Sequence, residues 1–123
     1  MNLDLECAVR SESLRDLIDK KDKKEKKDAA NLITKVLGVL QEDGIYAFYL
    51  YLRAEGKQIH DNIEVESKRL LNTVFPDIAV NSDGCTVAKQ IVSDANRTLL
   101  AKELLERMLV YARYHAKGLG DKP

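Results

Sequence analysis

The sequence predicts an all-α fold for residues 1–123: a single domain, built as a compact bundle of five or six helices with a long C-terminal helix. Glycine and proline number only six and two, and aromatic residues make up 6% of the chain. Strand-rich domains need more turn-forming and aromatic residues than this. Alanine, leucine, glutamate and lysine, which favour helices, fill long stretches in which apolar residues recur at helical spacing.

Two helices joined by a lysine-rich segment are predicted before Gly44. Leu3–Asp19 has apolar residues at helical spacing, with Ser11–Ser13 as a candidate interruption. Residues 20–27, the lysine-rich segment, contain six lysines and two acidic residues, so they form either a solvated connection or the start of the next helix. Residues 28–42 are amphipathic, and Gly44 predicts the end of their helix because glycine tolerates a left-handed conformation.

Residues 45–55 are apolar on nearly every side, which fits either a buried strand or a buried helix. Eleven residues exceed the usual strand length and glycines flank the segment, so we expect a mostly buried helix. Residues 57–62 are predicted to form a connection, residues 63–74 a short helix and residues 86–94 a modest helix. The inward-facing residues of this last segment are predicted to be Val87, Ile91 and Val92.

Residues 96–117 carry the strongest helical pattern, with one half of the helix surface apolar and the other half charged. At about 1.5 Å per residue this helix is roughly 33 Å long, enough to run the height of a small bundle. Gly118 predicts its end, and residues 118–123 are expected to form a flexible tail.

The charge balance limits the classes of function. Lysine plus arginine and aspartate plus glutamate each number 20, so the net charge is zero and a generally basic nucleic-acid binder is not indicated. Zero net charge does not exclude a local basic patch, because charges act over a Debye length of about 10 Å. The N-terminal residues lack the apolar core of a signal peptide, and no segment approaches the roughly 20 apolar residues that cross a bilayer. A cytoplasmic protein without membrane contact is therefore expected.

The sequence contains no recognisable catalytic centre, cofactor motif or metal site, so we expect a protein that is not an enzyme. Cys7 and Cys85 lie far apart, outside any cysteine or histidine cluster, and are interpreted as buried thiols. His60 and His115 are too few for a histidine-rich metal centre. A small enzyme with an unrecognised site is the least favoured alternative.

Basic residues are better candidates for function than any catalytic group. Several share the final helix with Tyr114, and the lysine-rich segment adds others. The candidates are Lys102, Arg107, Arg113, Lys117, Lys24 and Lys27. Cationic groups beside an aromatic ring can hold a phosphate chain and stack a base. A solvated helix face gives the same pattern and is the alternative interpretation.

Two segments, residues 39–52 and 99–116, carry a family resemblance. The first contains the end of an amphipathic helix, a polar-glycine-apolar stop and an aromatic-rich buried helix. The second is a long final helix with an alanine-arginine-aromatic run, Ala112-Arg113-Tyr114, near its end. Their order resembles the small helical subunit of type III-B CRISPR RNA-guided effector complexes.

The resemblance implies a non-catalytic helical bundle whose copies stack along a ribonucleoprotein complex, in contact with its other subunits. Basic residues of such a bundle face the guide or target RNA and contact its backbone. By position, Arg107 and Arg113 are the first candidates for RNA contact, followed by Lys102, Lys117 and the lysine-rich segment. Self-association of the chain is also implied.

A helical protein-interaction module without nucleic-acid contact is the alternative function. Tyr46, Tyr49 and Tyr51 would then dock a partner, because tyrosine is enriched at protein interfaces. Reversing the charge of Arg107 and Arg113 separates the two hypotheses. It should abolish RNA association under the first and leave partner binding intact under the second.

Overall fold

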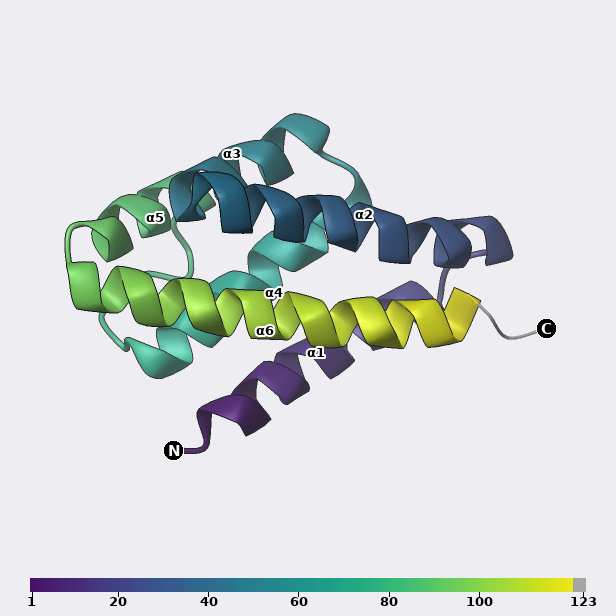
Figure 1. The fold of residues 1–123 in the computed structure, drawn as a ribbon, viewed down its shortest axis with the longest axis horizontal. Coiled ribbons are helices and arrows are strands. Elements are labelled where there is room, and N and C mark those ends of the chain that lie inside the picture. Colours follow the sequence, from purple (N-terminus) through teal and green to yellow (C-terminus); the bar gives the residue numbers. More distant parts are fainter. Residues whose placement is uncertain (121–123) are drawn as a thin grey trace.

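The computed structural model describes residues 1–120 of the chain, and these residues contain six helices and no strand (Figure 1). The all-α prediction is confirmed. The helices are α1 (Leu3–Asp19), α2 (Lys23–Asp43), α3 (Ile45–Glu55), α4 (Gln58–Val74), α5 (Gly84–Val92) and α6 (Ala95–Gly120). Within residues 1–120, no helix combines the length and apolar character needed to cross a membrane.

The long helix α6 organises the packing. Figure 1 shows α2 running beside α6, and α6 makes its most extensive contacts with α2 and then with α1. The two long helices are antiparallel: Lys102, near the start of α6, donates from Nζ to the carbonyl of Gln41 at the end of α2, over 3.1 Å. The last turns of α6 therefore lie beside the first turns of α2.

The region of α1 and α2 differs in detail from the prediction. Ser11 is fully buried and donates from its hydroxyl to the carbonyl of Ala8 over 2.7 Å, so α1 continues through it and the predicted interruption is wrong. The lysine-rich segment divides: residues 20–22 connect the helices, and residues 23–27 begin α2. Asp22 caps this start by accepting the backbone N–H of Glu25 over 2.8 Å.

The α4 helix begins at Gln58, so the predicted connection over residues 57–62 is wrong. No standard N-cap residue precedes α4. Instead, Nδ1 of the buried His60 accepts the backbone N–H of Lys57 over 3.2 Å, which satisfies one of the donors a helix start leaves open.

The predicted end of α6 is also wrong, because the helix continues past Gly118 to Gly120. Among the glycines of residues 1–120, only Gly44 and Gly56 have a positive φ, so Gly118 does not adopt the conformation that ends a helix. The tail predicted for residues 118–123 is thus helical as far as residue 120, and residues 121–123 lie outside the described part of the chain.

The α5 helix is displaced by two residues from its predicted position. Asp83 accepts the backbone N–H of Thr86 over 3.0 Å and starts the helix at Gly84. Val87 and Ile91 are fully buried, as predicted. Val92 is 46% exposed, so the prediction that it faces inward is wrong.

The helix predicted for residues 45–55 is confirmed as α3. One face is buried, with Phe48, Tyr49 and Leu52 in the core, while Tyr46 remains 41% exposed. The hydroxyls of Tyr49 and Ser67 form a hydrogen bond of 2.8 Å that ties α3 to α4.

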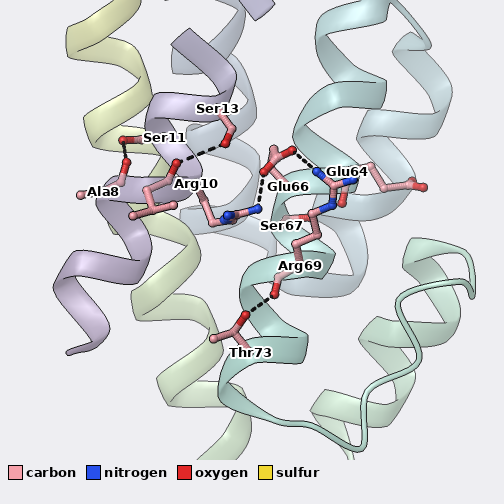
Figure 2. A network of polar contacts seen from close by, with 10 residues as sticks. Ala8, Arg10, Ser11, Ser13, Glu64, Glu66, Ser67, Arg69 and Thr73 are labelled. Atoms are coloured by element: carbon pink, nitrogen blue, oxygen red, sulfur yellow. Dashed lines mark hydrogen bonds and ion pairs between the residues drawn. The ribbon is translucent and has the colours of Figure 1, made fainter. Parts of the chain in front are cut away.

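A charged cluster joins α1 to α4. Figure 2 shows Arg10 of α1 and Arg69 of α4 pointing toward Glu66, with donor–acceptor distances of 2.9 and 3.0 Å. The Glu66 side chain is buried, and both of its carboxylate oxygens are paired with a guanidinium. Pairing of this kind is what allows a carboxylate to remain charged away from water.

Candidate nucleic-acid interface

The first turns of α2 and the last turns of α6 enclose a polar groove of about 500 Å³, here called the basic groove. Figure 1 shows these two helix ends next to each other, at the same end of the bundle. The polar residues that line the basic groove are Lys27, Asn31 and Thr34 from α2 and Arg113, Tyr114 and Lys117 from α6.

Helical spacing explains why each set lies on one face. Lys27, Asn31 and Thr34 are separated by four and three residues, and Arg113 and Lys117 by four, which are the spacings of neighbours on a helix surface. The antiparallel packing of α2 against α6 then brings the two sets opposite each other.

Gly120 allows the two helix ends to approach closely. A Cβ atom at this position would lie 3.2 Å from Cα of Lys27 and 3.3 Å from the carbonyl oxygen of Lys26. Ala112 and Ala116, earlier on α6, are fully buried. Small residues at this end of α6 therefore allow the two helices on either side of the basic groove to pack closely.

The three cations of the basic groove have no acidic partner among the described residues. The ion pairs of residues 1–120 leave the side chains of Lys27, Arg113 and Lys117 without a carboxylate within 4.0 Å. Because the chain carries equal numbers of acidic and basic residues, three neighbouring cations without a carboxylate partner in residues 1–120 are a local excess of positive charge in that part of the chain.

An exposed aromatic ring lies beside these cations. Tyr114 is 65% exposed, and the guanidinium carbon of Arg113 lies 5.5 Å from the centre of its ring. This distance is within the range of a cation–π contact. Asn31 and Thr34 add neutral hydrogen-bonding groups to the opposite wall.

Two of the predicted RNA-contacting residues are engaged elsewhere. Arg107 forms ion pairs with Glu103 at 3.2 Å and with Asp4 at 3.6 Å. Asp4 also accepts a hydrogen bond from Tyr111, which is the main cause that raises the pKa of that phenol. Lys102 donates to the carbonyl of Gln41 in the last turn of α2. These contacts give both cations a structural role, and neither lines the basic groove.

The remaining predicted cation, Lys24, is exposed on the first turn of α2 and does not line the basic groove. Asn31 and Thr34 do line it, and sequence reasoning missed them as site residues. Their spacing from Lys27 was a usable signal, since residues four and seven positions later lie on the same helix face.

The predicted tyrosine docking surface does not form as a unit. Tyr49 is fully buried, so its assignment to a partner-binding surface is wrong. Burial also raises the pKa of Tyr49 far above its ordinary value. Tyr51 is half-buried and lies edge-on to the ring of His60, and only Tyr46 of the three is exposed.

A second concavity, the apolar pocket, has a volume of about 340 Å³ and lies between α1, the start of α2 and the start of α4. Leu14, Leu17, Ile18, Leu32 and Ile59 supply its apolar wall. Its rim combines two lysines with two acidic residues, so it carries no excess charge of either sign. Such a pocket suits an apolar side chain better than a phosphate.

The two thiols and the candidate metal ligands can be located among the described residues. Cys7 and Cys85 are both buried, as predicted, and burial raises the pKa of the Cys7 thiol to about 11. Within residues 1–120, no group of three histidine, cysteine, aspartate or glutamate side chains could hold a metal ion.

Comparison of the chain with protein-family models, with curated proteins and with solved structures finds no match.

Proposed function

We propose that this protein is a non-catalytic subunit of an RNA-guided interference complex and that it holds guide or target RNA by its phosphates in the basic groove. The observation that carries the proposal is the convergence of Lys27, Arg113 and Lys117 from two distant segments, without a carboxylate partner in residues 1–120. The resemblance of residues 39–52 and 99–116 supplies the kind of complex.

Binding in this groove would be electrostatic. Lysine and arginine neutralise phosphates and release counterions, and contacts of this kind position the backbone without reading its sequence. For a single strand, each neutralised phosphate contributes about 0.7 to the slope of log affinity against log salt, so three cations predict a slope of about 2 from the groove.

The structure changes the order of the candidate residues. The resemblance placed Arg107 first together with Arg113, but Arg107 is paired with Asp4 and Glu103. Transfer of Arg107 to a phosphate would break these ion pairs, whereas Arg113 would break none that the described residues make. Arg113, Lys117 and Lys27 are therefore the primary contacts of the proposed interface.

The test is a salt titration with matched charge variants. A fluorescein-labelled 12-nucleotide RNA of mixed sequence is titrated with the protein and followed by fluorescence anisotropy. The groove variant is Lys27→Gln/Arg113→Gln/Lys117→Gln. The control variant is Lys20→Gln/Lys57→Gln/Lys89→Gln, which removes the same charge from three exposed lysines outside the groove.

The groove variant should weaken RNA binding at least tenfold at about 50 mM salt and lower the salt slope by about 2. The control variant should stay within about threefold of the wild type, since it alters only net charge. Equal losses in the two variants, or an affinity that does not depend on salt, would contradict the proposed interface. Affinity purification from the source cell tests the complex, which should contain several proteins and short RNAs.

A protein-interaction module without nucleic-acid contact is the second candidate function. The apolar pocket favours it, because about 340 Å³ lined by leucine and isoleucine can receive an apolar side chain of a partner. Exposed Tyr46 adds a second apolar contact on α3. Under this function, purification recovers a protein partner without RNA, and the groove variant keeps that partner.

A further inference from the structure

Tyr114 is the most exposed of the tyrosines in the described residues. It is 65% exposed and Tyr46 is 41% exposed, whereas Tyr49 is fully buried and Tyr51 and Tyr111 are partly buried. A phenol ring in water leaves a large apolar area uncovered. Tyr114 also lies on the wall of the basic groove, among its three cations.

The Arg113 guanidinium gives this ring a defined neighbour. Its carbon lies 5.5 Å from the ring centre, so the planar cation covers part of the ring while Tyr114 stays largely exposed. An arginine packed against a tyrosine presents both charge and a flat apolar surface. The pair is therefore shaped for a flat, electron-rich group that is joined to a negative charge.

The opposite wall matches the rest of a nucleotide. Lys27 offers a cation, and Asn31 and Thr34 offer donors and acceptors that can bond a ribose hydroxyl or a base edge. The groove volume of about 500 Å³ falls within the range of small-ligand sites. A base stacked in a duplex cannot enter such a groove, because both of its faces are already covered.

We propose that the basic groove takes one unpaired nucleotide, with its base stacked on Tyr114 and its flanking phosphates held by Lys27 and Lys117, an inference that rests on the function proposed above. The protein then prefers single strands to duplexes. It also binds a strand that carries bases more tightly than a bare sugar–phosphate chain.

The experiment compares three labelled probes: the 12-nucleotide RNA, an abasic strand of the same length, and a blunt 12-base-pair RNA duplex. Four single-residue variants, including Arg113→Lys, and the groove variant defined above are compared with the wild type. Tyr114→Leu removes the ring, Tyr114→Phe keeps the ring and removes the hydroxyl, and Tyr46→Leu removes an exposed tyrosine outside the groove. Thermal unfolding followed by circular dichroism checks that each variant is folded, as expected for exposed side chains.

Wild-type protein should bind the RNA strand about tenfold more tightly than the abasic strand and more tightly than the duplex. Tyr114→Leu should weaken binding of the RNA strand about tenfold, equivalent to about 1.4 kcal/mol, and leave the abasic strand unchanged. Tyr114→Phe and Tyr46→Leu should behave as the wild type. Arg113→Lys, which keeps the charge but loses the planar group, should weaken only the base-containing strand, by a few-fold.

Stacking on Tyr114 is overturned if Tyr114→Leu changes both strands equally or neither, or if Tyr114→Phe loses as much affinity as Tyr114→Leu. Duplex binding as tight as single-strand binding also overturns it. The proposed interface fails in a different way, through abasic binding that the groove charge variant does not weaken. The absence of binding to any probe at about 50 mM salt contradicts both proposals.

Discussion

The contact between Gly84 and Tyr49 leads to a sharp prediction about stability. A Cβ atom at Gly84 would lie 2.2 Å from Cδ1 and 2.6 Å from Cγ of the Tyr49 ring. Carbon atoms in contact normally lie about 3.5 to 4.0 Å apart, so the ring would have to move by more than about 1 Å. This ring is fully buried and its hydroxyl is bonded to Ser67.

Gly84→Ala should therefore destabilise the protein by about 3 kcal/mol. Overpacking of a core costs about 1 to 3 kcal/mol, and displacement of the Tyr49 hydroxyl from Ser67 adds part of a buried hydrogen bond, about 1 kcal/mol. The gain from replacing glycine in the first turn of α5 offsets less than about 1 kcal/mol. The melting temperature should fall by about 10 °C in a chain of this size.

Urea unfolding followed by circular dichroism at 222 nm measures the change in the free energy of unfolding. Gly38→Ala, within α2, is the matched control, since a Cβ at Gly38 would have no atom within 4 Å apart from its chain neighbours and the nearby backbone of its own helix. This variant should stabilise the protein by about 0.5 to 1 kcal/mol. In a Tyr49→Leu background, Gly84→Ala should cost at least about 1.5 kcal/mol less. If Gly84→Ala alone changes the free energy of unfolding by less than about 0.5 kcal/mol, the Tyr49 contact does not constrain this position.

Three further predictions concern buried polar groups. Burial lowers the pKa of His60, so neutral His60 contributes its full stability above pH 6.5, the ordinary pKa of histidine, and this contribution is lost as the pH falls through the folded-state pKa. Urea unfolding at pH 7.5 and 5.5 should show a lower free energy of unfolding at the lower pH. His60→Gln should remove this difference and His115→Gln should keep it. Buried Cys7 and Cys85 should not react with a thiol reagent in the folded protein, and both should react in denaturant; fast reaction of the folded protein would argue against their burial. Glu66→Gln should destabilise by about 2 kcal/mol in urea unfolding, because it leaves two guanidinium groups without their carboxylate, and a neutral result would show that the cluster in Figure 2 adds no stability.

The sequence patterns were sufficient to predict the helices that carry a clear apolar face. The helical character of residues 45–55 and the long final helix follow from length, periodicity and flanking residues, and the structure confirms both. The boundaries were less predictable, because they depend on individual side chains. His60 starts α4 through a ring nitrogen, which no capping rule based on serine, threonine or aspartate would select.

The exposure of the tyrosines could not be predicted from composition. Tyr46 and Tyr49 are three residues apart on the same helix, yet one is exposed and the other is fully buried. Helical spacing alone places them near each other on the surface of α3, and the outcome depends on how α4 and α5 cover that surface. Gly84 lies directly against the Tyr49 ring and shows how close this covering is.

Which basic residues can bind a ligand depends on pairing between distant segments. Arg107 and Arg113 lie on the same helix and are equivalent candidates by sequence. Arg107 forms an ion pair with Asp4 of α1, whereas Arg113 lines a groove together with Lys27 and Asn31 of α2. The first arrangement neutralises a cation and the second concentrates positive charge. This difference arises because α6 packs against α1 along one side and against α2 along another. Positive potential can therefore gather at one end of a chain whose net charge is zero, at the place where the end of α6 meets the start of α2.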